Sequence, residues 1–596
     1  MKDTRNRNFF LLLSALIFVF LVCKATLQAF SHDEAATFFH YIHKENFWPW
    51  RAHWDANNHI LNSASAWIFY KLFGYDLVWI RLPNVLSFLL YAYFIYRTSH
   101  FLKHLISRYA FQVAMLTPIF LLDFFTLCRG YGMSIAFWWG TLFYFVLLFQ
   151  TNKNRHALKA WLFMALAVWA NMSLLNNYLI FIAAYFFYLV FVARFKQFIH
   201  YLLLFIPGLL FYIPAAVYAF QMKEKGLLYL GSTDGFMEVT MKTLSLYQFG
   251  KNETWFLILL AILMVCSVFI NLYNKPISLD FKKYFSFEKF SSLLLLGNVI
   301  AVILLEKIVH VNYPEDRAGI YFIPLSIGVL FFAFDTLYAW NKKFIYTNLL
   351  ALYFPFYTIA NTSFTSTHLW DYLYLTSNLY KQAEKIQNEN NEPLIINAYH
   401  MYEMSWAYYN LKYGGQLQNM HVQPKPDLNA DLIVMPSYYF DTLKTDLYEE
   451  VFSQPFNALT LYKRKKFAKK TLYPINITST NGSGDYEFLD IFSDTLPSHF
   501  MDMQVQFSGI FSSKKHPFHA QIVLETKDIH GNVLLYDYIP LHWIKSKWKG
   551  EQKKFVRTIP SNKYSQVIIK IYLWNIDKQQ FSANIDSLKW FYIENK

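Results

Sequence analysis

Long uninterrupted runs of apolar residues dominate the first 362 residues of the chain. A helix that crosses a bilayer needs about 20 such residues, because its backbone polar groups find no water in the hydrocarbon. The runs therefore predict a polytopic α-helical membrane domain with about 11 spans. They cover residues 9–30, 76–96, 106–127, 131–150, 157–171, 174–193, 200–220, 254–273, 290–305, 318–338 and 345–361.

The basic residues between these runs predict how the chain crosses the membrane. Arg97, Lys103 and Arg108 follow the second run, and similar clusters recur in alternate loops, whereas most acidic residues occupy the other loops. Because Lys and Arg accumulate on the cytoplasmic side, we expect a multi-pass protein of the bacterial inner (cytoplasmic) membrane with a cytoplasmic N-terminus and extracytoplasmic C-terminal domains. This topology explains the net charge of +14, and no basic patch interleaved with aromatic residues predicts nucleic-acid binding.

After residue 362 the pattern changes to short alternating segments. Strands at 393–399, 431–439 and 456–466 and a helix over 398–414 predict a small extracytoplasmic α/β unit. Further strands at 519–528, 532–541, 553–559, 566–575 and 585–594 are typical of a β-sandwich, here jelly-roll-like. The sequence thus predicts three domains, at 1–365, 366–468 and 469–596.

Two adjacent carboxylates, Asp33 and Glu34, follow the first apolar run. A carboxylate beside apolar and aromatic surface can have its pKa raised toward the working pH, which suits a general base. The alternative is a helix start, in which Ser31 or Asp33 is the N-cap and the acids occupy the first turn. The two interpretations are compatible, because a capped helix would hold the acid rigidly.

The segment 53–59, HWDANNH, gathers polar side chains at the expected membrane surface, among them Asp55, Asn58 and His59. Acids, amides and aromatic residues gathered at the mouth of a span are typical of an active-site loop. His and Asp side chains could also bind a divalent cation, but the spacing matches no strong metal motif and favours a polar interfacial loop.

Two arginines stand at outer ends of predicted spans. Arg129, next to Tyr131, could meet an anionic headgroup or simply extend to the interface. Arg317 lies in a second polar loop with His310 and Tyr313. Because a guanidinium donates paired hydrogen bonds to phosphate oxygens, Arg317 is interpreted as a phosphate ligand, with an interface anchor as the alternative.

Several motifs, in this order, resemble those of the GT-C superfamily of membrane glycosyltransferases, in particular protein O-mannosyltransferases, aminoarabinose transferases and rhizobial galacturonosyltransferases. They are HDEA at 32–35, NNHILNSASAWIFYKLFG at 57–74, DLVWIRLPNVL at 76–86, CRGYGMSIAF at 128–137 and NYPEDRAGIYFIPL at 312–325.

The resemblance implies transfer of a sugar from a polyprenyl-phosphate donor to a hydroxyl of an envelope glycan, lipid or protein on the outer face of the membrane. It implies that Asp33 is the base, Glu34 its partner, and Arg317 and Arg129 the phosphate ligands. Asp55, Asn58, His59, Tyr131, His310 and Tyr313 would line the cavity. No cofactor is expected to be required, although a divalent cation could assist.

The function of the chain and the role of its C-terminal tryptophans each have an alternative interpretation. A transporter or lipid-linked glycan flippase is the competing function, but it would place ionisable residues along the middle of its spans. In the C-terminal region, Trp543, Trp548, Trp574 and Trp590 could bind sugar, whereas core packing explains most tryptophans in alternating strands.

Overall fold

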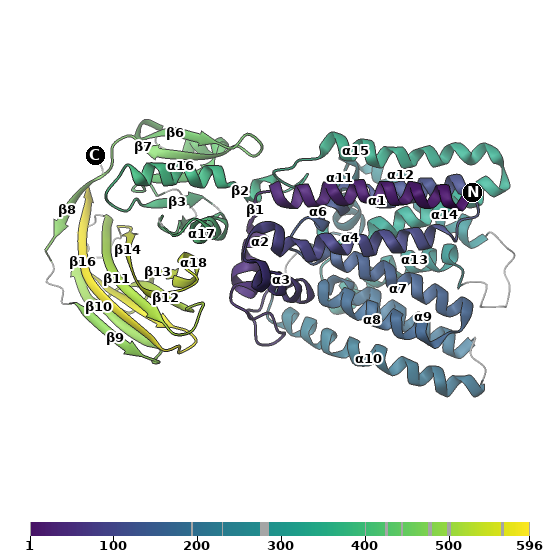
Figure 1. Ribbon diagram of the computed structural model, residues 1–596, viewed down its shortest axis with the longest axis horizontal. Coiled ribbons are helices and arrows are strands. Elements are labelled where there is room, and N and C mark those ends of the chain that lie inside the picture. The colour runs from purple at the N-terminus through teal and green to yellow at the C-terminus, as the bar shows by residue number, and fades with distance from the viewer. Residues whose placement is uncertain are drawn as a thin grey trace. The chain divides into compact units, whose positions relative to one another are not determined.

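The chain separates by packing into two units, shown as a computed structural model in Figure 1. Unit 1 comprises Met1–Gln28 and His40–Leu369, and unit 2 comprises Ala29–Phe39 and Trp370–Lys596. The short segment 29–39 therefore packs with the C-terminal part of the chain, and the predicted division into three domains stays a prediction. The structure describes residues 2–191, 195–228, 231–273, 285–399, 401–415, 417–423, 427–442, 445–474, 479–497, 502–561 and 566–594.

Unit 1 is built from helices (Figure 1). They are α1 (Lys2–Leu27), α3 (Ile60–Phe73), α4 (Leu77–Ser99), α5 (Leu105–Leu116), α6 (Ile119–Phe125), α7 (Tyr131–Thr151), α8 (Asn154–Ala170), α9 (Leu175–Phe191), α10 (Phe195–Glu224), α11 (Lys242–Phe249), α12 (Thr254–Tyr273), α13 (Phe287–Val309), α14 (Phe322–Trp340) and α15 (Tyr353–Asn361). Short 3-10 and π-helical turns join them, including η3 (Met237–Met241), η5 (Asp316–Gly319) and η6 (Lys342–Leu352).

Within the described residues, eight helices are long and apolar enough to cross a membrane, or nine if the pair α5 and α6 forms one span. That pair is bent by 55° where Pro118 lacks the N–H that a continuous helix requires. The chain is thus a multi-pass membrane protein. The predicted count of 11 spans is not confirmed, because α8 has 17 residues and the 345–361 run forms part of η6 and the 9-residue α15.

Helices α7 and α14 form the centre of unit 1. Their apolar windows are 83% and 78% buried, against 17% for α10 and 22% for α12, whose apolar side chains face outward as in a lipid-exposed helix. Gly328 of α14 allows close packing, since a Cβ there would lie 3.0 Å from the Trp139 ring of α7. Trp139 also contacts Phe287 of α13, with ring centroids 6.0 Å apart.

Unit 2 begins with an α/β part. Its sheet has the order β4 (His421–Gln423), β3 (Ile396–Tyr399), β5 (Leu432–Pro436), β7 (Leu459–Arg464), β6 (Tyr448–Ser453), in which β4, β3 and β5 are parallel and β7 runs antiparallel to both β5 and β6. Helices α16 (Ser377–Asn388) and α17 (Glu403–Lys412) accompany the sheet. Strand β1 (Phe30–Ser31) pairs with β2 (Tyr374–Leu375), which fastens segment 29–39 to this unit.

The rest of unit 2 is β-rich, as predicted, with two antiparallel sheets (Figure 1). One has the order β10 (Phe488–Pro497), β15 (Gln566–Asn575), β12 (Ala520–Lys527), β13 (Val533–Pro540), and the other the order β14 (Lys549–Ile559), β11 (Asp502–Ser513), β16 (Phe581–Glu594), β8 (Lys469–Tyr473), with β9 (Thr480–Gly484) beside β16. Alternate residues of both sheets, such as Ile569 and Val505, form one hydrophobic cluster. The jelly-roll-like sandwich class stays a prediction.

Candidate active site

The carboxylate pair lies in α2 (His32–Thr37), a one-and-a-half-turn helix of unit 2. Ser31 is its N-cap: the Ser31 hydroxyl accepts the Glu34 N–H at 3.4 Å and donates to the Glu34 carboxylate at 3.1 Å. The same carboxylate accepts the Ser31 N–H, so Glu34 completes a capping box and is fully buried. The helix-start interpretation is therefore confirmed, and it fixes the backbone that carries the half-buried Asp33.

Aromatic residues hold this short helix on α17. Phe30 packs against Tyr408 with ring centroids 4.4 Å apart, and Phe38 meets the same ring at 5.6 Å. The Phe30 N–H also donates to the Tyr409 hydroxyl at 3.4 Å. The segment that carries Asp33 is thus positioned by residues as far as 379 positions away in the chain, a contact that no local pattern reveals.

Asn58 and His59 lie in unit 1, at the end of a polar loop. The Asn58 amide donates to the Phe47 carbonyl at 3.3 Å, and its oxygen accepts the Ser63 hydroxyl at 3.3 Å. His59 Nδ1 lies 2.8 Å from the Ala170 carbonyl. Both side chains are buried, whereas Asp55 is half-buried and its carboxylate accepts the Asn57 N–H at 2.7 Å.

Arg129 and Tyr131 join this group. An Arg129 nitrogen lies 3.5 Å from the Tyr131 hydroxyl, to which it donates, and the guanidinium is 5.5 Å from the ring centroid. The rings of Tyr131 and His59 meet edge to face at 4.5 Å. Arg129 is 4% exposed, which rules out the interpretation that it extends to the interface. Between them, Gly130 is required, since a Cβ there would lie 1.9 Å from the Ala170 carbonyl oxygen.

Asn84 of α4 fixes the turn that carries Arg129. Its amide nitrogen donates to the Leu127 carbonyl at 2.9 Å, and its oxygen accepts the Met133 N–H at 2.7 Å. One buried side chain thus ties both ends of the turn. Asn84 belongs to the motif at 76–86. The sequence alone did not predict that this motif positions Arg129.

Tyr41 is a buried residue near Asp55 and Arg129, and the sequence did not predict it as part of the site. Burial raises the pKa of Tyr41 well above its usual value, Asp55 and Tyr218 act in the same direction, and Arg129 opposes them. Asp55 and Arg129 therefore both act electrostatically on this phenol. Its hydroxyl is fully buried and has no hydrogen-bond partner among the residues that the structure describes. In a chain with 44 tyrosines, no signal in the sequence singles it out.

The second polar loop is fastened to η3 and to the first turn of α11. The Thr240 hydroxyl donates to the Pro314 carbonyl at 2.7 Å, and the Asp316 N–H donates to the Thr243 hydroxyl at 3.0 Å. The buried Tyr313 donates its N–H to the Ser232 carbonyl at 3.0 Å, whereas the His310 side chain is exposed at the end of α13. Tyr313 therefore anchors the loop.

Asp316 is a carboxyl group of this loop whose pKa is raised by burial. The residue has a left-handed backbone, φ 58°, and its carboxylate accepts the N–H of Arg317 and a hydrogen bond from Tyr247. Burial raises the pKa of Asp316 to about 7, against the opposing effects of Arg317 and Tyr247, while Glu315 adds to the increase. Arg317 thus lies next to a carboxyl group whose charge changes near neutral pH.

Aromatic rings connect the two arginine groups. Tyr131 packs on Phe124 with centroids 4.8 Å apart, Phe124 on Phe120 at 5.1 Å, and Phe120 on Tyr247 at 5.1 Å. The two phenylalanines belong to α6, so the groups of Arg129 and Arg317 flank one short helix of unit 1. Asp33 belongs to unit 2, and its predicted meeting with Arg317 stays a prediction.

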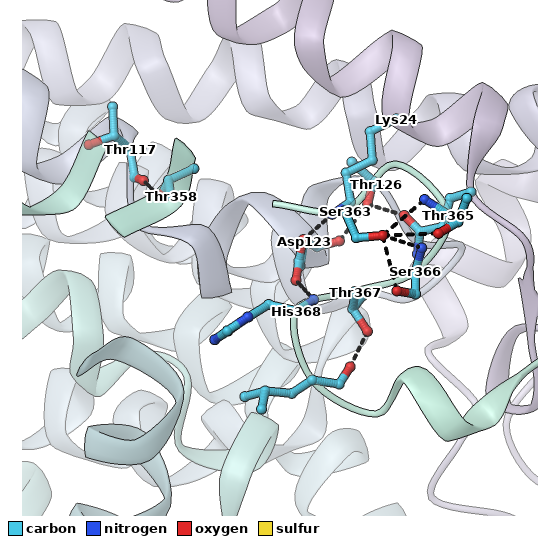
Figure 2. Close-up of polar contacts among 12 residues, drawn as sticks. Lys24, Thr117, Asp123, Thr126, Thr358, Ser363, Thr365, Ser366, Thr367 and His368 are labelled. Atoms are coloured by element: carbon cyan, nitrogen blue, oxygen red, sulfur yellow. Dashed lines mark hydrogen bonds and ion pairs between the residues drawn. The ribbon is translucent and has the colours of Figure 1, made fainter. Parts of the chain in front are cut away.

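A buried ion pair between Lys24 of α1 and Asp123 of α6 was not foreseen (Figure 2). Lys24 Nζ lies 2.6 Å from one Asp123 oxygen, and the side chains are 0% and 4% exposed. The other oxygen accepts the His368 N–H at 2.7 Å. Burial lowers the pKa of His368, as Lys24 does, whereas Asp123 raises it. This network ties the segment that leaves α15 to the first and third predicted spans.

No cluster of three or more His, Cys, Asp or Glu side chains that could hold a metal ion occurs among the described residues. In the HWDANNH segment, the His53 ring stacks on His40 with centroids 4.6 Å apart. The predicted possibility of a divalent cation stays a prediction.

No family model and no curated protein matches the chain. Its fold is similar to that of ArnT from Cupriavidus metallidurans, with 11% identity and a TM-score of 0.35 over 78% of this chain and 98% of that one in the apo state. The structure of ArnT from the same organism bound to undecaprenyl phosphate shows 11% identity and a TM-score of 0.36, over 76% of this chain and 97% of that one. Arabinosyltransferase EmbB from Mycobacterium smegmatis shows 9% identity and a TM-score of 0.36, over 96% of this chain and 64% of that one.

Proposed function

We propose that this chain is a membrane glycosyltransferase that moves a sugar from a polyprenyl-phosphate donor to a hydroxyl acceptor on the outer face of the bacterial inner membrane, with its N-terminus in the cytoplasm. One observation carries the proposal: a row of contacting aromatic rings along α6 begins at Tyr131, on which Arg129 lies, and ends at Tyr247, which hydrogen-bonds Asp316 next to Arg317. The order of the sequence motifs supports it, and ArnT, a protein of similar fold, has been crystallised with undecaprenyl phosphate.

The donor phosphate would bind to Arg317, with Arg129 as a second cation. A guanidinium offers two parallel N–H donors to phosphate oxygens, and a buried one is weakly screened. The buried hydroxyl of Tyr41, beside Arg129 and Asp55, would donate to a polar ligand atom. Asn58, His59 and Tyr131 would form the wall of this site, and Tyr313 would hold the second loop.

The acceptor hydroxyl would be activated by Asp33. Its oxygen attacks the anomeric carbon as Asp33 takes the proton, and the bond between that carbon and the phosphate oxygen breaks. The electron pair leaves with the lipid phosphate, whose growing negative charge Arg317 stabilises. Glu34 would act indirectly, because its carboxylate holds the turn on which Asp33 lies. The step balances without a cofactor.

The direct test is transfer by the purified full chain in nanodiscs. Undecaprenyl phosphate carrying a radiolabelled sugar is supplied with a crude envelope fraction, and label in the acceptor is measured against label in free lipid. We expect labelled acceptor. Movement of the donor between leaflets in vesicles without any labelled acceptor would instead identify a flippase and refute the proposal.

Replacing Arg317 with alanine is expected to weaken binding of undecaprenyl phosphate about ten- to a hundredfold, because charge-assisted hydrogen bonds contribute roughly 1.5–3 kcal/mol. The KM for the acceptor should change far less. Arg317→Lys should give an intermediate loss, since it keeps the charge and loses the paired donors. Arg97→Ala, which removes an exposed cation of α4, is the control. Equal weakening of donor and acceptor would contradict the assignment.

Donor binding should also depend on pH through Asp316. Below its pKa of about 7 the carboxyl is neutral, and above it a negative charge appears beside Arg317 and reduces the attraction for phosphate. Between pH 6 and 8, we expect the dissociation constant for undecaprenyl phosphate to rise about fivefold more in the unchanged chain than in Asp316→Asn. This difference corresponds to roughly 1 kcal/mol, the effect of one nearby charge. A calorimetric titration at each pH measures it, and identical pH profiles would refute this role.

A further inference from the structure

One face of the sheet β10, β15, β12, β13 points away from the core of unit 2. Ile571 and Leu573 of β15 belong to the hydrophobic cluster, so their neighbours Lys570, Tyr572 and Trp574 lie on the opposite face. The same alternation places Phe488 and Asp490 of β10, Glu525 of β12, and Tyr536 and Tyr538 of β13 on that face.

Five aromatic rings gather there, and we call them the aromatic face: Phe488, Tyr536, Tyr538, Tyr572 and Trp574. Phe488 is 52% exposed, Tyr536 45% and Tyr538 40%. Phe488 is paired across the strands with Trp574, and their rings stack at 6.0 Å and 21°. Tyr572 and Tyr538 both lie opposite Val523, so the rings form rows across the sheet. Side chains this large are costly to leave exposed unless they bind something.

Charged groups lie between these rings and balance one another. Lys570 forms an ion pair with Asp490 at 3.0 Å and lies 5.4 Å from the Tyr572 ring centroid. On the next strand, Lys527 pairs with Glu525 at 3.0 Å. The face therefore combines flat apolar rings with hydrogen-bonding groups and carries no net charge from these four residues.

This combination selects among possible partners. The core of a protein interface is depleted of charged residues, and a membrane-binding surface carries an excess of Lys and Arg. Neither fits the aromatic face. A pyranose ring has one surface of C–H bonds, which pack on the negative face of an aromatic ring, and a rim of hydroxyl groups, which need donors and acceptors nearby.

We infer that the aromatic face of unit 2 binds a neutral oligosaccharide, with Trp574 and Tyr572 stacking on successive sugar rings and Asp490, Lys570 and Glu525 binding hydroxyls. Residues 572 and 574 follow one another on one side of a strand, about 6.7 Å apart, which is within the reach of neighbouring sugar units. The other three tryptophans considered from the sequence are at most 3% exposed and cannot take part.

The test measures binding without turnover, so its result does not depend on the proposed transferase activity. The full chain in nanodiscs is titrated with cellotetraose, maltotetraose and mannotetraose by isothermal calorimetry. We expect saturable binding of at least one of them, weakened up to about tenfold in Trp574→Ala, since an aromatic stacking contact contributes up to roughly 1.5 kcal/mol. Tyr572→Ala should weaken it in the same direction.

Tyr438→Ala is the matched control, because Tyr438 is 62% exposed in unit 2 but lies outside this sheet. It should bind as the unchanged chain does. Absence of saturable binding to all three sugars, or an equal affinity of the Trp574 and Tyr438 variants, would overturn the inference. Tighter and Trp574-dependent binding of an anionic polysaccharide such as alginate would overturn the assignment of a neutral ligand.

Discussion

Replacing Asp33 with asparagine is expected to reduce sugar transfer by about 10²- to 10⁴-fold, the usual contribution of a general base. Asparagine has nearly the same shape but cannot accept a proton at neutral pH. Because α2 is capped by Ser31 and Glu34 and packs on Tyr408, the fold should survive the change. Binding of undecaprenyl phosphate should be unaffected, so kcat falls while donor affinity stays. Single-turnover transfer and donor titration of the same sample measure both quantities.

Two variants separate the base from its support. Glu34→Gln keeps an oxygen that can accept the Ser31 N–H, so it should preserve the cap and lower transfer much less than Asp33→Asn. Asp33→Glu retains a carboxylate at a displaced position and should recover part of the rate. Normal turnover by Asp33→Asn would exclude Asp33 as the base, even if every other part of the proposal held.

Replacing Lys24 with methionine is expected to destabilise the protein by about 3–5 kcal/mol, because it leaves the carboxylate of Asp123 buried without its cation. The double variant Lys24→Met/Asp123→Asn should recover most of this loss. Its asparagine carries no charge and still offers an oxygen to the His368 N–H. Thermal unfolding in detergent, followed by intrinsic fluorescence, compares the two variants.

The exposed pair of Lys71 and Glu45 provides the control for Lys24→Met. Its two side chains are 45% and 31% exposed, and a surface ion pair contributes about 0–1 kcal/mol. Lys71→Met should therefore barely change the unfolding temperature. If the Lys24 variant were equally harmless, the buried pair would make no net contribution, and another group would have to neutralise Asp123.

The sequence predicts the helices of unit 1 well where length and apolarity agree. The runs at 131–150 and 254–273 coincide with α7 and α12 almost to the residue. At the 345–361 run the predicted span is not confirmed, because the composition is apolar but the first half, in η6, is a 3-10 helix. Composition indicates the solvent that a segment prefers, and it does not indicate the pitch of its backbone.

The candidate site was predicted in part. His59 belongs to the motif at 57–74, and Arg129 and Tyr131 belong to the motif at 128–137. The two motifs are far apart in the sequence, but these three side chains lie together in unit 1. The Lys24–Asp123 pair and the hydroxyl of Tyr41 were missed, because each depends on a long-range contact or on one tyrosine among many. The roles of Asp33 and Arg317 in catalysis stay predictions.

The membership of segment 29–39 in unit 2 has a consequence for how such an enzyme could change its substrate. The two arginines proposed to bind the lipid phosphate belong to unit 1, whereas the proposed base, Asp33, belongs to unit 2, which contains the β-sheets. Exchange of residues 370–596 would therefore keep Asp33 itself and change the surface on which its segment packs, including Tyr408. The residues proposed to bind the lipid carrier, Arg129 and Arg317, would stay the same.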